Sequence, residues 1–164
     1  MELYKLNNKW SKLLIWSLCV IVIFLLLSFA IFANKILLPS LSAKTPEVRA
    51  NIQKVLTAKF LSEFSGGYWE NVLVDRGKAI KRLPLEDRLY FYRLVLLNCY
   101  LDTSSALMFI EIIGNDALQF KIHLIKFQED PTFMKLSQRE QELVISWIRE
   151  MDIIVEQKRA NLTP

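Results

Sequence analysis

Side chains that could act as nucleophiles or proton carriers are scarce in this chain, which has one histidine and two cysteines among 164 residues. His123 is the single histidine, and Cys99 is the single thiol outside the apolar N-terminal run that holds Cys19. A cysteine and a histidine from distant positions can assemble into a catalytic pair. Cys99 lies on the apolar face of a predicted helix, however, so we expect an inert core thiol. Its burial would argue against the pair.

Carboxylates and metal ligands offer no clearer chemistry. Glu111 lies inside an apolar run, where a carboxylate withdrawn from water needs a partner or has a raised pKa. We instead expect Glu111 at an exposed angle of its helix or beside a basic neighbour. No second carboxylate stands at a spacing typical of a glycosidase acid-base pair, and the spacing of the histidine and the cysteines does not fit a zinc site.

Glycines are too few and too widely spaced to form a nucleotide-binding loop. The four glycines of the chain are Gly66, Gly67, Gly77 and Gly114. The sequence therefore predicts no metal, no cofactor and no small-molecule substrate, and it indicates that the chain is not an enzyme. A membrane-tethered hydrolase that uses Cys99, His123 or Glu111 is the alternative.

A basic segment is the best candidate for binding. Six basic side chains fall within 18 positions, and they are Arg76, Lys78, Lys81, Arg82, Arg88 and Arg93. Such a segment suits anionic lipid headgroups or an acidic partner protein. The simpler interpretation is a solvated loop and helix start.

Two large rings follow the glycine pair Gly66-Gly67. Tyr68 and Trp69 would suit a partner contact if they were exposed. We expect both rings to be buried, because a domain this small uses most of its aromatic side chains in its core. Near the C-terminus, 161–163 fits a glycosylation sequon, which we attribute to chance.

The N-terminal part of the chain must position everything that follows. From Leu13 to Ala33 run 21 residues without a charge, enough to cross a hydrocarbon core of about 30 Å. In lipid such a segment has to be a helix. A cleaved signal peptide is the alternative, but its apolar region would span only about 7–15 residues. We therefore predict an uncleaved signal-anchor that contacts the lipid bilayer.

The charges beside this segment predict its orientation. Lys5, Lys9 and Lys12 precede it closely, so the positive-inside rule places the N-terminus in the cytoplasm. The expected location is the plasma (inner) membrane, single-pass, with the C-terminal domain extracytoplasmic; a cytoplasmic domain is the alternative. Without these lysines the remaining charges nearly balance, so we expect no nucleic-acid partner.

Helix signals continue along the rest of the chain. Thr45-Pro46 predicts a helix start and Gly66-Gly67 its end. We expect 68–82 to be irregular, with one short helix and a turn at 75–78. Pro84 then opens a nearly all-apolar helix at its first position, which should be the central one.

The second half is expected to hold a helical hairpin and a long terminal helix. The hairpin covers 106–113 and 117–127, with Asp116 capping its second helix; a β-hairpin near 107–124 is the alternative, since side chains alternate there. Ser137 and Glu140 form a capping box. The helix that follows should extend to about Ala160.

These signals together predict an all-α protein. We divide it into a short N-terminal tail (1–12), a transmembrane signal-anchor helix (13–34), a linker (35–45) and a compact helical domain (46–164) of about five or six helices. The expected function is a single-pass, membrane-anchored interaction module, a subunit or regulatory partner of a membrane or cell-envelope complex that binds another protein. An inhibitor or immunity-type protein would have the same features.

Overall fold

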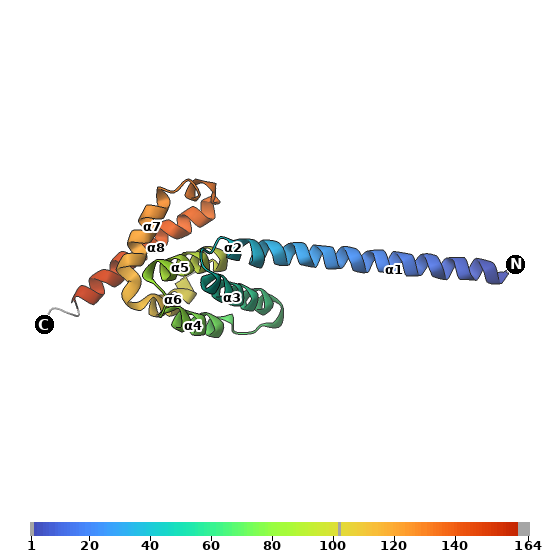
Figure 1. The fold of residues 1–164 in the computed structure, drawn as a ribbon, viewed down its shortest axis with the longest axis horizontal. Helices are drawn as coiled ribbons and strands as arrows, with labels where there is room; N and C mark the ends of the chain where they lie inside the picture. The colour runs from blue at the N-terminus through green and yellow to red at the C-terminus, as the bar shows by residue number, and fades with distance from the viewer. Residues whose placement is uncertain (1, 102, 161–164) are drawn as a thin grey trace.

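The computed structural model describes residues 2–101 and 103–160, and over these residues the chain is all-helical. The predicted sequon lies outside them. Helices α3 to α8 form a bundle, and α1 projects from it as a long rod (Figure 1). In chain order the elements are α1 (Glu2–Phe32), the π-helical η1 (Ala33–Leu37), α2 (Leu38–Leu41), α3 (Pro46–Ser65), α4 (Trp69–Ile80), α5 (Leu85–Cys99), α6 (Thr103–Ile113), the 3-10 turn η2 (Gly114–Asp116), α7 (Ala117–Gln128), the 3-10 turn η3 (Phe133–Lys135) and α8 (Gln138–Ala160).

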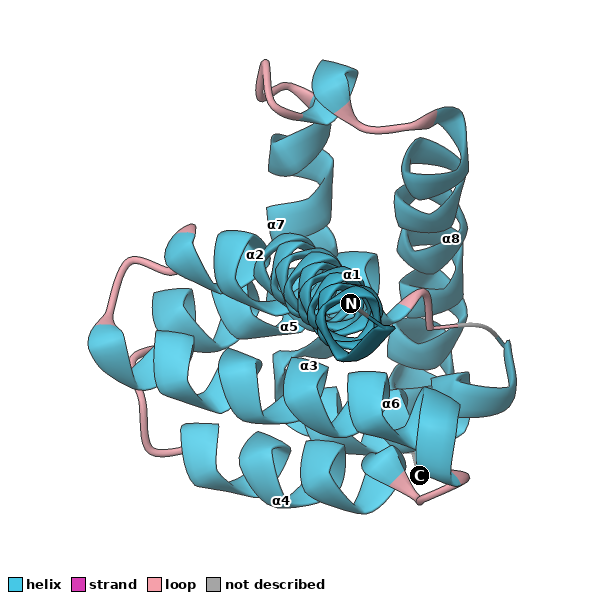
Figure 2. Ribbon diagram, turned by 90° about the vertical axis from the view of Figure 1, so that its right-hand side faces the viewer, coloured by secondary structure: helices cyan, strands magenta, loops and turns pink. Residues whose placement is uncertain are grey.

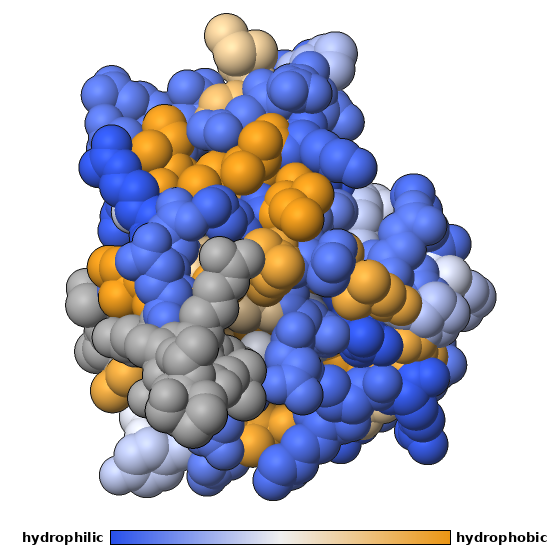
Figure 3. Space-filling model, turned by 90° about the vertical axis from the view of Figure 1, so that its left-hand side faces the viewer, coloured by the Kyte–Doolittle hydropathy of each residue, from blue (hydrophilic) through white to orange (hydrophobic). Residues whose placement is uncertain are grey.

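The bundle has two parts that share one core. In the view down α1, α3, α4 and α5 lie across the picture, whereas α7 and α8 stand side by side and crosswise to them (Figure 2). The hairpin of α6 and α7 is helical, as predicted, and the β-hairpin alternative is wrong. The end of the bundle remote from α1 is largely hydrophilic, with separate hydrophobic patches (Figure 3).

The apolar helix α1 is continuous with the bundle. Residues 12–41 form one helical stretch long and apolar enough to cross a membrane, judged by length and composition. The predicted linker, 35–45, is helical as far as Leu41, and it buries Ile36, Ser40 and Ala43. Gln53 of α3 donates a hydrogen bond to Ser40 Oγ (3.1 Å). The base of α1 is thus packed against α3.

Two predicted helix starts are confirmed by their capping geometry. Thr45 Oγ1 accepts a hydrogen bond from the backbone N–H of Val48, and α3 ends at Gly66, whose φ of 66° is the left-handed value that glycine tolerates. At α8, the backbone N–H of Ser137 donates to Glu140 Oε2 (2.8 Å) and the N–H of Glu140 donates to Ser137 Oγ (3.4 Å). This capping box opens a helix that reaches Ala160, as expected.

The segment after α3 differs from its prediction. It forms one continuous helix, α4, over most of 68–82, and the turn expected at 75–78 is wrong. Gly77 lies inside this helix, at a point where α6 passes close by. A Cβ at position 77 would stand 2.5 Å from Ile112 Cγ2, so only glycine fits there without a shift of Ile112. The glycine there serves helix packing and does not break the helix.

Replacing Gly77 by alanine should therefore destabilise the chain although alanine favours helices. Alanine gains up to about 1 kcal/mol of helix propensity, but the clash with Ile112 costs about 1–3 kcal/mol. We expect a net loss of about 1 kcal/mol in the free energy of unfolding, measured by denaturant titration in mild detergent. In a chain that already carries Ile112→Ala, the same Gly77→Ala change should be neutral or stabilising; destabilisation in both backgrounds would contradict the packing explanation.

Helix α5 is the central helix, as its composition predicts. Its first residue is Leu85, one position after the predicted start, and Pro84 is the N-cap. Its buried residues surround the helix, and they are Leu89, Phe91, Tyr92, Leu94, Val95, Leu96, Leu97 and Cys99. Tyr92 contacts the rings of Phe109 and Phe120 edge to face, at centroid distances of 6.2 and 5.6 Å. These rings join α5, α6 and α7 in one core.

Candidate functional site

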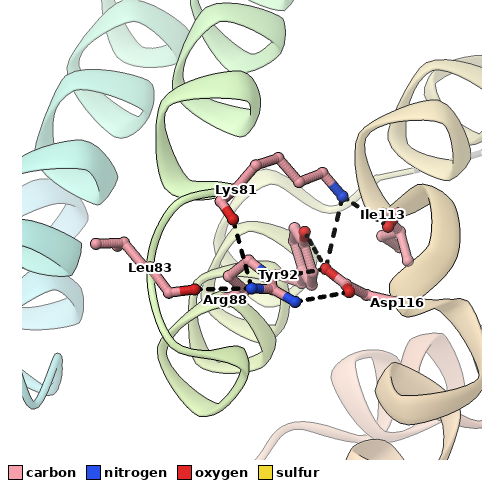
Figure 4. A network of polar contacts seen from close by, with 6 residues as sticks. All are labelled: Lys81, Leu83, Arg88, Tyr92, Ile113 and Asp116. Atoms are coloured by element: carbon pink, nitrogen blue, oxygen red, sulfur yellow. Dashed lines mark hydrogen bonds and ion pairs between the residues drawn. The ribbon is translucent and has the colours of Figure 1, made fainter.

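The best-defined polar cluster surrounds the carboxylate of Asp116 (Figure 4). Arg88 donates from Nε to Oδ2 (2.8 Å) and from Nη2 to Oδ1 (2.9 Å). Tyr92 donates its hydroxyl proton to Oδ2 (2.9 Å). Lys81 Nζ lies 3.5 Å from Oδ2 and donates to the carbonyl of Ile113 (2.8 Å). The cluster thus connects the end of α4, the first turns of α5 and the α6–α7 break.

The electrostatics of this cluster favour a fixed charge pair. Burial alone would raise the pKa of Asp116, but hydrogen bonds from Arg88 and Tyr92 and the charges of Lys81 and Arg88 lower it below its usual value. Burial raises the pKa of Tyr92 well above its usual value. Both groups therefore keep one protonation state near neutral pH. The cluster holds helices together and is poorly suited to proton transfer.

Asp116 was expected to cap α7, and that expectation is wrong. It occupies the N-cap position, but its side chain makes no capping hydrogen bond. The Arg88 guanidinium also donates from Nη1 to the carbonyl of Leu83 (2.7 Å). A bidentate carboxylate–guanidinium contact is stronger than a single capping hydrogen bond. This explains why the Asp116 side chain points toward Arg88 and not toward the N-terminus of α7.

The two residues of the hypothetical catalytic pair lie in unreactive surroundings. Cys99 is buried, and burial raises the pKa of its thiol to about 12. His123 is half-buried and its ring stacks on Phe120, with centroids 6.5 Å apart. Burial, followed by the charge of Arg93, lowers the pKa of His123 from 6.5 to about 4. The thiol is thus protonated and the imidazole neutral near pH 7, and Cys99 is the inert core thiol that we expected.

The lowered pKa of His123 predicts an acid-sensitive fold. In the unfolded chain this histidine takes up its proton near its usual pKa of 6.5, and in the folded chain only near 4. The unfolded state therefore binds more protons between these values, and stability falls as the pH decreases through this range. Between about pH 7 and pH 5 we expect a loss of roughly 1 kcal/mol, after allowance for the part of the ring that reaches solvent.

The measurement compares melting temperatures of the native chain and of His123→Gln at both pH values. A loss of this size corresponds to a decrease of roughly 2–4 °C for a chain of this length. The glutamine variant should lose that part of the pH dependence. If both chains show the same decrease, other groups cause the acid sensitivity.

Three of the six residues of the predicted basic segment contact groups within the bundle. Arg88 and Lys81 contact Asp116, as described above. The guanidinium of Arg93 stacks on Phe127 at 4.2 Å and on Tyr90 at 4.6 Å from the ring centroids. These side chains are held by intramolecular partners.

The other three basic residues differ in their exposure, and the side chain of Lys81 is itself 40% exposed. Arg82 is exposed and forms a long ion pair with Glu47 (3.9 Å). Lys78 is exposed on α4, and Arg76 is half-buried beside a shallow hollow between α3 and α4. Contact of the six basic residues with headgroups or an acidic partner stays a prediction.

Of the two rings that follow Gly66-Gly67, one is exposed and the other is buried. Trp69 is buried, as expected, and Lys59 Nζ lies 4.8 Å from its ring centroid. Tyr68 is 82% exposed, so the expectation that it is buried is wrong. It precedes the first helical residue of α4, where its ring has no core surface to cover. Glu111 is exposed on α6, as predicted.

Two adjoining hollows at the base of α1 have no counterpart in the sequence predictions. The first is an open apolar groove of about 1080 Å³, lined by residues of the C-terminal part of α1 and by Phe60 and Phe64 of α3. The second is a polar pocket of about 270 Å³, lined by Lys35, Lys59 and other polar residues together with Phe60. Phe60 and Phe64 were expected on one apolar helix face, but the sequence did not indicate that they face α1.

The fold therefore defines an all-helical bundle with one long apolar helix that projects from it. Among the described residues, no group of three or more histidine, cysteine or acidic side chains is placed to hold a metal ion. Comparison of the chain with protein-family models, with curated proteins and with solved structures found no match.

Proposed function

We propose that this chain is a single-pass, membrane-anchored helical interaction module. The observation that carries the proposal is the exposure of α1. Between Leu13 and Phe29 its large apolar side chains are 45–72% exposed. Removing apolar surface from water is favourable by roughly 25 cal/mol per Å². A bilayer would remove all of this surface from water at once. A helix of this length matches the bilayer thickness.

The charged residues at the two ends of α1 support an anchor that spans the bilayer. Lys12 precedes the uncharged run and Lys35 follows it. The three lysines before the run favour a cytoplasmic N-terminus in the plasma (inner) membrane, with the bundle extracytoplasmic. Protease added to sealed spheroplasts should then digest the bundle. Full protection, with digestion only after lysis, would reverse the orientation and leave the anchor in place.

A protein partner has a candidate surface on α7. Leu118, Ile122 and Ile125 are spaced four and three positions apart, so they share one face of the helix, and each is 38–41% exposed. Side chains of this kind lose contact with water when a second protein covers them. The surface lies on the bundle and is separate from the apolar surface of α1.

The test is purification of the full chain from its membrane in mild detergent, with identification of the chains that copurify. The Ile122→Glu variant should lose its partner, because a charge on the apolar face would have to be buried. Gln119→Glu, a charge at an exposed position on the same helix, is the matched control and should keep the partner. Recovery of the native chain only as an isolated monomer would contradict the interaction module, and equal binding by both variants would exclude this face.

A further inference from the structure

We propose that the two hollows at the base of α1 form one seat for a zwitterionic phospholipid, with the acyl chains in the apolar groove and the headgroup in the polar pocket. This inference rests on the proposed membrane anchor. It names a specific lipid partner for a site that the anchor alone does not require.

The apolar groove lies where acyl chains would be. One wall is formed by α1 residues between Val22 and Phe32, inside the uncharged run, and the other by Phe60 and Phe64 at the end of α3. If α1 spans the bilayer, this stretch of it lies within the hydrocarbon core, so the space between the two helices opens onto lipid. Its volume of about 1080 Å³ is slightly larger than that of ordinary ligand pockets, which is roughly 300–1,000 Å³.

The end of α3 has the side chains of a membrane-interface segment. Phe64 is 76% exposed, and Leu61 and Tyr68 are exposed beside it at the α3–α4 corner. Aromatic rings with one polar end favour the headgroup region of a bilayer. The corner would therefore enter the interface next to α1, and the apolar surface of the groove continues without a break onto that of α1.

The polar pocket adjoins the groove because Phe60 lines both hollows. Lys35, on the first turn after α1, forms an ion pair with Glu63 (3.4 Å). Tyr100 donates a hydrogen bond to Glu140 Oε1 (3.4 Å) across the pocket. These contacts place charged groups at the level where the uncharged run of α1 ends, which is where headgroups lie.

The charges of the pocket determine which headgroup fits. Its ionisable lining comprises two lysines, Lys35 and Lys59, and two glutamates, Glu63 and Glu140, together with Tyr100. A headgroup with a phosphate and an ammonium group can pair with both signs, the phosphate with the lysines and the ammonium with the glutamates. An anionic headgroup without an ammonium group would leave the two carboxylates facing its negative charge.

Tyr100 adds a conformational observation at the rim of this pocket. It is the C-cap of α5, and its φ of 47° lies in the left-handed region. Glycine or asparagine is the usual residue there. A tyrosine accepts a conformational cost at this position, and its hydroxyl in return reaches Glu140. The left-handed backbone at Tyr100 thus places its side chain at the rim of the pocket.

The experiment uses the full chain in vesicles made of equal parts phosphatidylethanolamine and phosphatidylglycerol. Each preparation carries a trace of one of these two lipids with the same diazirine-bearing acyl chain, and the cross-linked peptides are mapped after illumination. We expect the phosphatidylethanolamine probe to label 60–64 and 28–32 at least threefold more than 13–20, which precedes the stretch of α1 that lines the groove. The phosphatidylglycerol probe should label the same peptides at least threefold less.

Variants separate the seat from general lipid contact. Phe64→Ser should reduce labelling of these peptides severalfold, and Leu107→Ser, which removes an exposed leucine from α6, should not. Glu63→Gln and Glu140→Gln should each reduce the preference for the zwitterionic probe, because only the ammonium group distinguishes the two headgroups, whereas Glu111→Gln, at an exposed position of α6, should leave it unchanged.

Flotation of the vesicles distinguishes the two ways of failing. A chain that does not float with the vesicles contradicts the membrane anchor itself. A chain that floats, but is labelled evenly along α1 or equally by both probes, overturns the lipid seat and leaves the anchor in place.

Discussion

Replacing Asp116 by asparagine is expected to lower the free energy of unfolding by about 3 kcal/mol. The substitution keeps the size of the side chain but removes the charge that Arg88 and Lys81 contact. The Asp116 side chain is 12% exposed and that of Arg88 is 19% exposed, so the remaining guanidinium is left largely out of water without a counter-charge. Removal of one partner from a buried pair typically costs about 3–5 kcal/mol, and the slight exposure places our estimate at the lower end. For a chain of this length, the melting temperature should fall by roughly 6–12 °C.

A second ion pair of similar length provides the control. Lys44 Nζ lies 2.7 Å from Glu86 Oε1, but the two side chains are 64% and 74% exposed. Glu86→Gln should therefore change stability by less than about 0.5 kcal/mol. Equal losses in the two variants would show that burial does not determine the effect. In a double-mutant cycle, Asp116→Asn and Arg88→Met should show a coupling of at least about 1.5 kcal/mol, since both act on one contact.

Three arginines at the centre of the apolar run should release the chain from the membrane. The 15 leucine, isoleucine, valine and phenylalanine residues between Leu13 and Ala33 together favour insertion by about 5–9 kcal/mol. Each arginine near the centre costs about 2.5–3.5 kcal/mol. Ile21→Arg, Ile23→Arg and Leu25→Arg in one chain would therefore offset the whole favourable free energy. After an alkaline carbonate wash, most of the native chain should sediment with the membranes, and most of the triple variant should stay in the supernatant.

The matched control places the same three charges before the apolar run. Asn7→Arg, Asn8→Arg and Ser11→Arg add to the lysines already there and should leave the chain in the membrane pellet. Retention of the central triple variant in the pellet would mean that something other than α1 holds the chain, and would contradict the proposed anchor.

Those parts of the fold that depend on neighbouring residues could be predicted from the sequence. Thr45-Pro46 and the Ser137–Glu140 pair mark helix starts through contacts three residues apart, so local residue types are sufficient to define them. The segment 68–82 was mispredicted because Gly77 has two opposite uses. A glycine can end a helix, or it can let another helix approach closely, and only the position of Ile112, 35 residues away, shows which applies here.

The polar cluster could not be predicted for a similar reason. Arg88 and Asp116 are 28 residues apart, and their contact depends on how α5 and the α6–α7 break cross in three dimensions. From the sequence, Arg88 belonged to a solvated basic segment and Asp116 to a helix cap. Lys81 is an exposed charge, and its contacts with Ile113 and Asp116 could not be predicted from the sequence either.

The most direct test of the membrane anchor uses the two native cysteines. Cys19 lies in α1 with its side chain exposed, and Cys99 is buried in the bundle. In broken membranes, where both faces are accessible, a polar maleimide reagent should leave both cysteines unmodified, because lipid covers Cys19 and the core covers Cys99. A third cysteine introduced by Asn115→Cys, at an exposed position, should react completely, and all three should react in denaturing detergent. Rapid modification of Cys19 in the membrane preparation would show that α1 is in contact with water and would contradict the account.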